Sequence, residues 1–107
     1  PPRAAGALKA RELAELMKQG AVVPVDVREP AAYNRAHLPG AKNMPLEEIE
    51  NRLAELYMLP GQPALYDRSG DKVKELAERM ANQGTPVAFL EGGILAWESE
   101  GLPIERP

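Results

Sequence analysis

The sequence predicts an α/β fold in which a mainly parallel sheet is covered by helices on both faces. Short apolar segments rich in β-branched residues, such as 21–27 and 86–90, have the composition of buried strands. Between them lie segments whose apolar residues recur every three to four positions, which is typical of helices with one buried face. Because strands and helices alternate with short connections, right-handed crossovers and parallel pairing are expected.

The composition limits what the chain can do. Its 107 residues are enough for one domain, which we expect to span residues 1–107. The net charge of -3 argues against nucleic-acid binding, and no apolar run is long enough to insert into a membrane, so a cytoplasmic location is expected unless an N-terminal segment has been removed. With one histidine and no cysteine, disulfides, thiolate metal sites and a cysteine nucleophile are excluded, and neither a metal nor a cofactor is expected.

The first part of the chain is predicted to contain a terminal segment, a helix and a strand. Residues 1–6 and 102–107 are rich in proline and are expected to be linker or terminal segments. In residues 8–18, apolar side chains recur at helical spacing and a glycine follows, which predicts a helix. Residues 21–27 predict a buried strand, provided that Pro24 lies where its missing N–H does no harm.

The rest of the chain continues the alternation of helices and extended segments. A helix opened by proline is expected over residues 30–36, followed by a turn at 37–40 and a brief extended segment at 41–44. A further helix begins at Pro45, because apolar residues repeat every three to four positions after it. The later elements are a strand at 64–66, a tight loop at 68–70, a helix marked by residues 73–80 and capped at Gly84, a strand at 86–90 and a helix at 94–100.

The loop that follows the strand at 64–66 is the predicted site. In an open parallel sheet, ligands bind beyond the carboxyl ends of the strands, where loops lead into helices. A short loop containing glycine can direct several backbone N–H groups at one point, and the next helix adds the positive end of its dipole. The sequence therefore predicts an anion-binding loop that consists of Asp67, Arg68, Ser69, Gly70, Asp71 and Lys72. The cationic side chains of Arg68 and Lys72 are expected at its rim.

These segments resemble the signatures of the rhodanese-like domain family. Residues 25–29, with Tyr33 and then the His-Leu-Pro-Gly-Ala run at 37–41, are similar to the first signature of that family. Residues 90–97, followed by the Gly-Leu-Pro run at 101–103, are similar to its closing signature. Together with the central loop they span nearly the whole chain in the family's order. The resemblance implies a sheet of about five parallel strands flanked by helices.

The resemblance implies one position at which a cysteine would be expected but is missing. Active members of the family begin the central loop with a cysteine that takes up a sulfane sulfur as a persulfide and passes it to a thiophilic acceptor. In an alignment on residues 68–70, the position of that cysteine is Asp67. A carboxylate is too hard a nucleophile to carry sulfur, so we expect Asp67 to accept the N–H bonds meant for a thiolate and to repel other anions. Smaller departures are Ala36, Lys72 and Val73, where the family usually has glycine, arginine and a small hydroxyl residue.

The resemblance implies a rhodanese-like domain that is inactive as a sulfurtransferase and acts as a recognition or regulatory module. Its partner is expected to be another protein or another domain of the same polypeptide. The alternative is a non-catalytic domain, or a cysteine-replaced form, of a thiosulfate sulfurtransferase. A third interpretation, hydrolytic or phosphoryl chemistry on Asp67, conflicts with the short loop, because related phosphatases use a cysteine in a longer one.

Three residues outside the loop are expected to support it. Asp26 and Arg28, at the end of the strand at 21–27, are expected to form a structural ion pair or a loop hydrogen bond rather than to act in catalysis. His37, in a turn, is expected to be a hydrogen-bonded structural imidazole.

Four residues of the closing segment have expected structural roles. Gly92 and Gly93 are expected to place the N-terminus of a helix near the loop, and Leu95 and Trp97 to belong to the core. At the loop tip two interpretations remain open, because Arg68 either takes part in recognition or pairs with a neighbouring carboxylate, that of Asp67 or Asp71.

Overall fold

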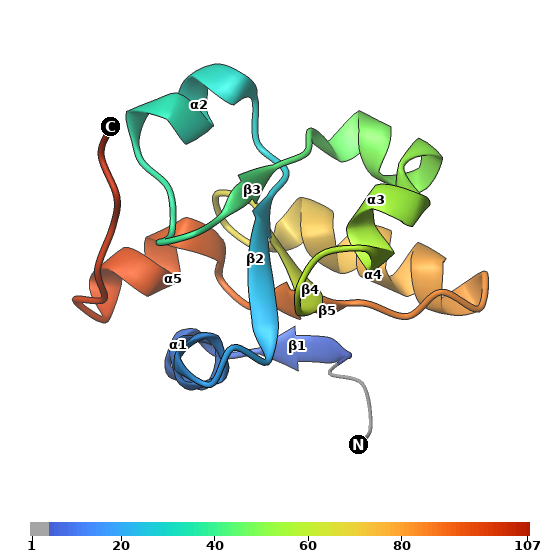
Figure 1. The fold of residues 1–107 in the computed structure, drawn as a ribbon, viewed down its shortest axis with the longest axis horizontal. Coiled ribbons are helices and arrows are strands. Elements are labelled where there is room, and N and C mark those ends of the chain that lie inside the picture. Colours follow the sequence, from blue (N-terminus) through green and yellow to red (C-terminus); the bar gives the residue numbers. More distant parts are fainter. Residues whose placement is uncertain (1–4) are drawn as a thin grey trace.

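Five parallel strands form one sheet in the computed structural model, which describes residues 5–107 (Figure 1). The strands follow the order β1-β5-β4-β2-β3 across the sheet. They are β1 (Gly6–Leu8), β2 (Val22–Asp26), β3 (Lys42–Asn43), β4 (Gln62–Tyr66) and β5 (Ala88–Leu90). The helices are α1 (Ala10–Lys18), α2 (Pro30–Arg35), the 3₁₀ helix η1 (Leu46–Asn51), α3 (Leu53–Tyr57), α4 (Asp71–Asn82) and α5 (Gly93–Ser99). The predicted α/β fold with a five-stranded parallel sheet is confirmed.

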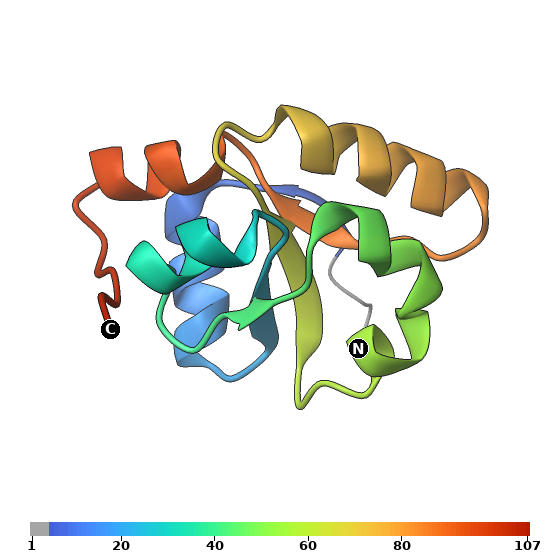
Figure 2. The same cartoon turned by 90° about the horizontal axis from the view of Figure 1, so that it is seen from above.

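The helices cover both faces of the sheet, as predicted (Figure 2). Core residues of η1, α3 and α4 pack with one set of strand residues, which includes Val25 and Leu65. Core residues of α1 and α5 pack with the alternate set, which includes Ala64 and Tyr66. Successive side chains of a strand point to opposite faces, so β4 contributes to both cores. The short helix α2 lies beyond the carboxyl end of β2 instead (Figure 1).

Pro24 lies inside β2 without removing a hydrogen bond to β4. The amide of Gln62 donates to Ala21 O at 3.0 Å, and the amide of Val27 donates to Tyr66 O at 2.9 Å. Odd-numbered residues of this segment therefore turn their backbone groups toward β4. The nitrogen of Pro24 turns to the opposite edge, where β3 pairs with only the last two residues of β2. The predicted placement of this proline is confirmed.

The N-terminal prediction is wrong in part. Gly6 is the first residue of a strand and not part of a linker, and Leu8 ends that strand instead of beginning a helix. The strand is held by backbone bonds to β5, with Gly6 N donating to Val87 O at 3.2 Å and Glu91 N donating to Leu8 O at 2.8 Å. Three small or apolar residues carry no alternating pattern, so the sequence could not reveal this pairing. Residues 1–4 lie outside the described residues.

Of the two descriptions expected for residues 102–107, a terminal segment fits better than a linker, because the segment packs on the domain. Leu102 and Ile104 are partly buried against the core. The indole Nε1 of Trp97 donates to Pro103 O at 2.8 Å, and Glu105 forms an antiparallel bridge with His37. These contacts join positions far apart in the sequence, which local composition cannot predict.

Two further expectations need correction. The helix predicted from Pro45 is divided at Arg52 into η1 and α3, because a spacing of three to four residues fits a 3₁₀ turn as well as an α-helix. Leu95 is 45% exposed and does not belong to the core, whereas Ile94 and Trp97 are buried. Residues three apart on a helix share a face, and Leu95 lies about 100° away from the face that those two residues turn to the sheet.

Candidate functional site

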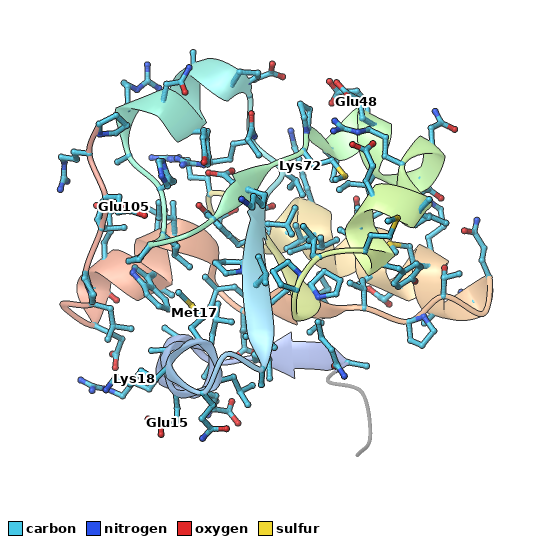
Figure 3. All side chains as sticks on the ribbon, viewed as in Figure 1. Glu15, Met17, Lys18, Glu48, Lys72 and Glu105 are labelled. Carbon is cyan, nitrogen blue, oxygen red and sulfur yellow. The ribbon has the colours of Figure 1, made fainter. Side chains whose placement is uncertain are left out.

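The predicted loop lies at the base of a cleft at the carboxyl edge of the sheet. The cleft has a volume of about 560 Å³ and lies between α2 and η1, where Figure 3 shows Lys72. Its apolar walls include Ala31, Ala32 and Leu46. Of the predicted site residues, the cleft is lined by Arg28, Asp67, Arg68, Ser69, Asp71 and Lys72. Gly70, Asp26 and His37 do not line it.

The carboxylate of Asp67 fills the point at which the loop amides converge. Gly70 N donates to Oδ1 at 2.5 Å, while Lys72 N and Val73 N donate to Oδ2 at 3.0 and 3.4 Å. The first N–H groups of a helix have no partner inside the helix, so this carboxylate satisfies donors at the start of α4. Asp67 is buried. The expectation that its side chain accepts the loop N–H bonds is confirmed.

Two glycines allow α5 to close against the back of the loop. Ile94 N donates to Asp67 O at 3.0 Å, and Leu95 N donates to Arg68 O at 3.1 Å. A Cβ atom on Gly93 would lie 2.3 Å from Arg68 O, and one on Gly70 would lie 2.7 Å from the nitrogen of Gly92. The expected placement of a helix N-terminus near the loop is therefore confirmed, and it fixes the loop from behind.

The side chains at the loop tip are exposed and make few contacts within the domain. Among residues 5–107, the side chains of Arg68 and Lys72 form neither an ion pair nor a hydrogen bond. The pairing of Arg68 with Asp67 or Asp71 is therefore wrong, since Asp67 is occupied by backbone donors. Ser69 Oγ lies 3.3 Å from Asp71 Oδ2 and donates to it. Two unpaired cations are thus left facing the cleft.

Asp26 and Arg28 form the expected structural ion pair. The carboxylate of Asp26 is fully buried, and Arg28 Nη2 lies 2.7 Å from its Oδ2. The amide and Nε of Arg28 also donate to Oδ1, at 2.9 and 3.0 Å, and Nη2 donates to Ala36 O at 2.6 Å. Burial by itself would lower the pKa of Arg28, but the hydrogen bonds and the charge of Asp26 outweigh it and raise that pKa. The guanidinium is thereby fixed at the edge of the cleft.

Sequence reasoning missed two residues that shape this edge. Asn43 Nδ2 donates to the carbonyl oxygens of Asp26 and Arg28, at 2.9 and 3.0 Å, and so ties β3 to the end of β2. Tyr66 is fully buried directly before Asp67, and its hydroxyl accepts a bond from Leu38 N at 3.1 Å. A tyrosine in an apolar strand was the available signal, because a buried hydroxyl requires a partner.

His37 has the expected structural role. Its Nδ1 lies 2.8 Å from Tyr33 O, and its ring stacks on the Tyr33 ring with centroids 4.0 Å apart. A carbonyl only accepts hydrogen bonds, so Nδ1 carries the proton. The Nε2 atom lies 3.8 Å from Glu105 Oε1. The imidazole thus orders α2 and the C-terminal segment.

Neither a metal-binding cluster nor a membrane-spanning helix is found in the part of the chain that the structure describes. Within residues 5–107, no three His, Cys, Asp or Glu side chains are grouped so that they could hold a metal ion. No helix in this part of the chain is long and apolar enough to cross a membrane.

The fold and the loop together define a class of protein. It is a small α/β domain that directs backbone N–H groups at one anionic group beyond the carboxyl end of a central parallel strand. The chain belongs to the rhodanese-like domain family, whose model matches residues 9–100. The resemblance to this family is therefore confirmed.

The chain is also similar to three proteins of different descriptions. A sulfurtransferase of Allochromatium vinosum is 34% identical over 87 residues, which cover 80% of this chain and 80% of that protein. An HTH-type transcriptional regulator of Mycobacterium tuberculosis is 35% identical over 101 residues, which cover 94% of this chain and 45% of the regulator. The crystal structure of a rhodanese-related protein from Thermoplasma volcanium has a TM-score of 0.81 at 26% identity and covers 94% of this chain and 98% of that one. The chain spans about half the length of two curated relatives, 54% and 45%.

Replacing Gly93 with alanine is expected to destabilise the domain, because the new Cβ would lie 2.3 Å from Arg68 O. The matched control is Gly20→Ala, since Gly20 also has a positive φ but has no atom within 4 Å of the new Cβ. The control is expected to lose about 1–2 kcal/mol of unfolding free energy from its backbone conformation alone. Urea denaturation should show at least twice that loss for Gly93→Ala, and equal losses would contradict the close packing of α5 on the loop.

Stability is expected to fall at alkaline pH in part through Tyr66. Burial, followed by the charge of Asp26, raises the pKa of Tyr66 well above its ordinary value. A group whose pKa is raised by folding stabilises the protein below its unfolded pKa, here about 10, and this contribution is lost as the pH rises further. In urea denaturation between about pH 9 and pH 11, Tyr66→Phe should therefore lose less stability than the wild type. Equal losses in the two proteins would contradict this assignment.

Proposed function

We propose that this rhodanese-like domain does not transfer sulfur and acts as a recognition or regulatory module through the cleft above residues 67–72. One observation carries the proposal. The point at which the loop N–H groups converge is occupied by the carboxylate of Asp67, and the chain contains no cysteine. We place Asp67 at the position where active members of the family have their nucleophile. No thiol is then present to form a persulfide.

The chemistry of a carboxylate supports the loss of sulfur transfer. A persulfide requires a soft, polarisable nucleophile, whereas a carboxylate oxygen is hard. The oxygens of Asp67 are further engaged by three backbone donors, which stabilise their charge and reduce their nucleophilicity. An anionic donor such as thiosulfate would also meet a negative charge already at the base of the cleft. The same carboxylate keeps the loop in an anion-filled conformation without any ligand.

The geometry of the loop tip supports recognition of another protein or another domain of the same polypeptide. The exposed cations of Arg68 and Lys72 stand on a loop that α5 holds rigid. Exposed side chains on a rigid loop are a common basis for recognition, because little ordering is required on binding. The similar transcriptional regulator of Mycobacterium tuberculosis, of which this chain matches 45%, supports a regulatory setting.

A second candidate function is that of a non-catalytic domain, or a cysteine-replaced form, within a thiosulfate sulfurtransferase. The similarity to the Allochromatium vinosum sulfurtransferase favours it. This candidate requires a cysteine-bearing domain in the same polypeptide or a natural sequence with cysteine at position 67. The full sequence of the gene distinguishes the two candidates. A complete reading frame that encodes Asp67 and no cysteine-bearing domain would remove the second one.

The substitution Asp67→Cys tests the loss of sulfur transfer. We expect the wild type to show no transfer of sulfur from thiosulfate to cyanide above a heat-inactivated control. The cysteine variant should fold and acquire turnover, because the loop amides and the dipole of α4 that now hold the carboxylate would stabilise a thiolate. A persulfide on the variant would appear in intact-mass spectra.

The control for this experiment is Asp67→Asn, which keeps the shape of the side chain but supplies neither charge nor thiol. It is expected to show no turnover and to be less stable, because its amide group would face the backbone donors of α4. Turnover by the wild type would overturn the proposal. A folded cysteine variant whose thiol titrates at about 8.5, the ordinary value, would show that the loop does not stabilise anions.

Recognition is tested by replacing Arg68 and Lys72 together with alanine. Both side chains are unpaired within residues 5–107, so the unfolding free energy should change by less than about 0.5 kcal/mol. Affinity capture from the source cells should recover a protein with the wild type and lose it with the double variant. Lys74→Ala, which removes an exposed charge from α4 outside the cleft, is the matched control and should keep the bound protein. Identical capture by all three proteins would contradict a role for the loop tip.

A further inference from the structure

Three consecutive residues, Ala36, His37 and Leu38, are each held by a different part of the molecule. The carbonyl of Ala36 accepts a bond from Arg28 Nη2 at 2.6 Å. The amide of Leu38 donates to the Tyr66 hydroxyl at 3.1 Å. Between them, the backbone of His37 pairs with the C-terminal segment. Residues 36–38 therefore form a junction between the cleft and the end of the chain.

The C-terminal strap, defined as residues 102–105, is attached to this junction by backbone and side-chain bonds. Glu105 N donates to His37 O at 2.8 Å, and His37 N donates to Glu105 O at 3.0 Å. The carboxylate of Glu105 also accepts a bond from Gly40 N at 2.6 Å. Figure 1 shows the strap rising from α5 toward α2, and Figure 3 shows Glu105 beside that segment. The strap thus lies across the turn that carries the junction.

On its other side, the junction contacts residues that shape the cleft. Arg28 lines the cleft, and its guanidinium is positioned by Asp26 and by Ala36 O together. Tyr66 directly precedes Asp67, and its buried hydroxyl is held by Leu38 N. A shift of residues 36–38 would therefore act on the arginine at the edge of the cleft and on the residue before its central carboxylate.

The two ends of this network differ in stability. Asp26 and Tyr66 are fully buried, whereas in the strap Pro103 and Glu105 are exposed and Leu102 and Ile104 are only partly buried. Segments with exposed hydrogen bonds and little apolar burial open locally at a small fraction of the global unfolding free energy. The strap is therefore the part of the network that can be released while the sheet remains folded.

We propose that residues 102–105 act as a strap that regulates the cleft. With the strap bound, residues 36–38 hold Arg28 and Tyr66 in place, and release of the strap loosens both and thereby the loop at 67–73. The coupling runs through contiguous hydrogen bonds and needs no change in the strand order. A regulatory role for this coupling rests on the proposed recognition function, whereas the coupling itself does not.

The substitution Glu105→Pro tests this coupling. Proline has neither an N–H group nor a carboxylate, so the variant loses the bond to His37 O and the bond from Gly40 N. Hydrogen exchange followed by NMR should be about two- to tenfold faster, as expected for the loss of a net hydrogen bond, at a defined set of amides. That set comprises Leu38, which bonds Tyr66, and the three donors to Asp67, namely Gly70, Lys72 and Val73.

Two readouts and one matched control separate strap release from other effects. Trp97 is the only tryptophan and its indole donates to Pro103 O, so its fluorescence should report release of the strap directly. Arg106→Pro is the matched control, because it places proline one residue further on, where the amide makes no hydrogen bond within the described residues. The control should leave both the fluorescence and the exchange rates unchanged.

Two patterns of hydrogen exchange would overturn the proposal. Faster exchange confined to His37, Gly40 and the strap would show that the junction does not transmit the change. Uniformly faster exchange, including the core of β5, would show that the strap stabilises the whole domain and not the cleft. If Glu105→Pro fails to fold, Glu105→Ala removes the bond from Gly40 N and the 3.8 Å contact with His37 Nε2 but keeps both backbone bonds to His37, and it should give the same pattern with smaller changes. None of these measurements involves sulfur or a partner, so they can fail independently of the proposed function.

Discussion

The buried carboxylate of Asp26 is the interaction on which the carboxyl edge of the sheet depends. It holds the guanidinium of Arg28 at the cleft, while the backbone oxygen of the same residue accepts bonds from Asn43 Nδ2 and Met44 N that fix β3. Removing one partner of such a buried pair commonly costs about 3–5 kcal/mol, because the other charge is left without compensation. The position of Arg28 therefore depends on a side chain that never reaches the cleft, and the short strand β3 depends on the backbone oxygen of the same residue.

The buried carboxylates of two acidic residues at the ends of neighbouring strands are stabilised in different ways. Asp26 is neutralised by a cation, whereas Asp67 is stabilised by backbone N–H groups at the start of α4. The first arrangement fixes a side chain at the rim, and the second fixes the loop itself. Because the carboxylate of Asp67 is already bonded by backbone donors, it pairs with the side chain of neither Arg68 nor Lys72, and these two cations remain available to an external partner. This division of roles is the physical basis of the proposed recognition function.

The sequence predicted the elements whose signals are local. The alternation of strands and helices after β1, the loop at 67–72 and the ion pair of Asp26 followed from periodicity, glycine placement and the family signatures. Pairings between segments that are far apart in the sequence could not be predicted. Gly6–Leu8 is a strand only because β5 lies beside it, and Glu105 pairs with His37 only because the fold brings the two segments together. Tyr66 was missed because an aromatic residue in a buried strand fits packing as well as positioning.

A fixed carboxylate in the loop restricts how such a site can be regulated. A cysteine changes charge, size and bonding as it takes up and releases sulfur, so its loop can respond to chemistry. Asp67 has no such states, and its oxygens are held by three backbone donors. A change at the cleft must therefore come from the residues around it. Of these, Arg28 is the one that the backbone of residues 36–38 helps to position. In the regulation that we propose, mechanical coupling through that segment takes the place of the chemical cycle of a cysteine.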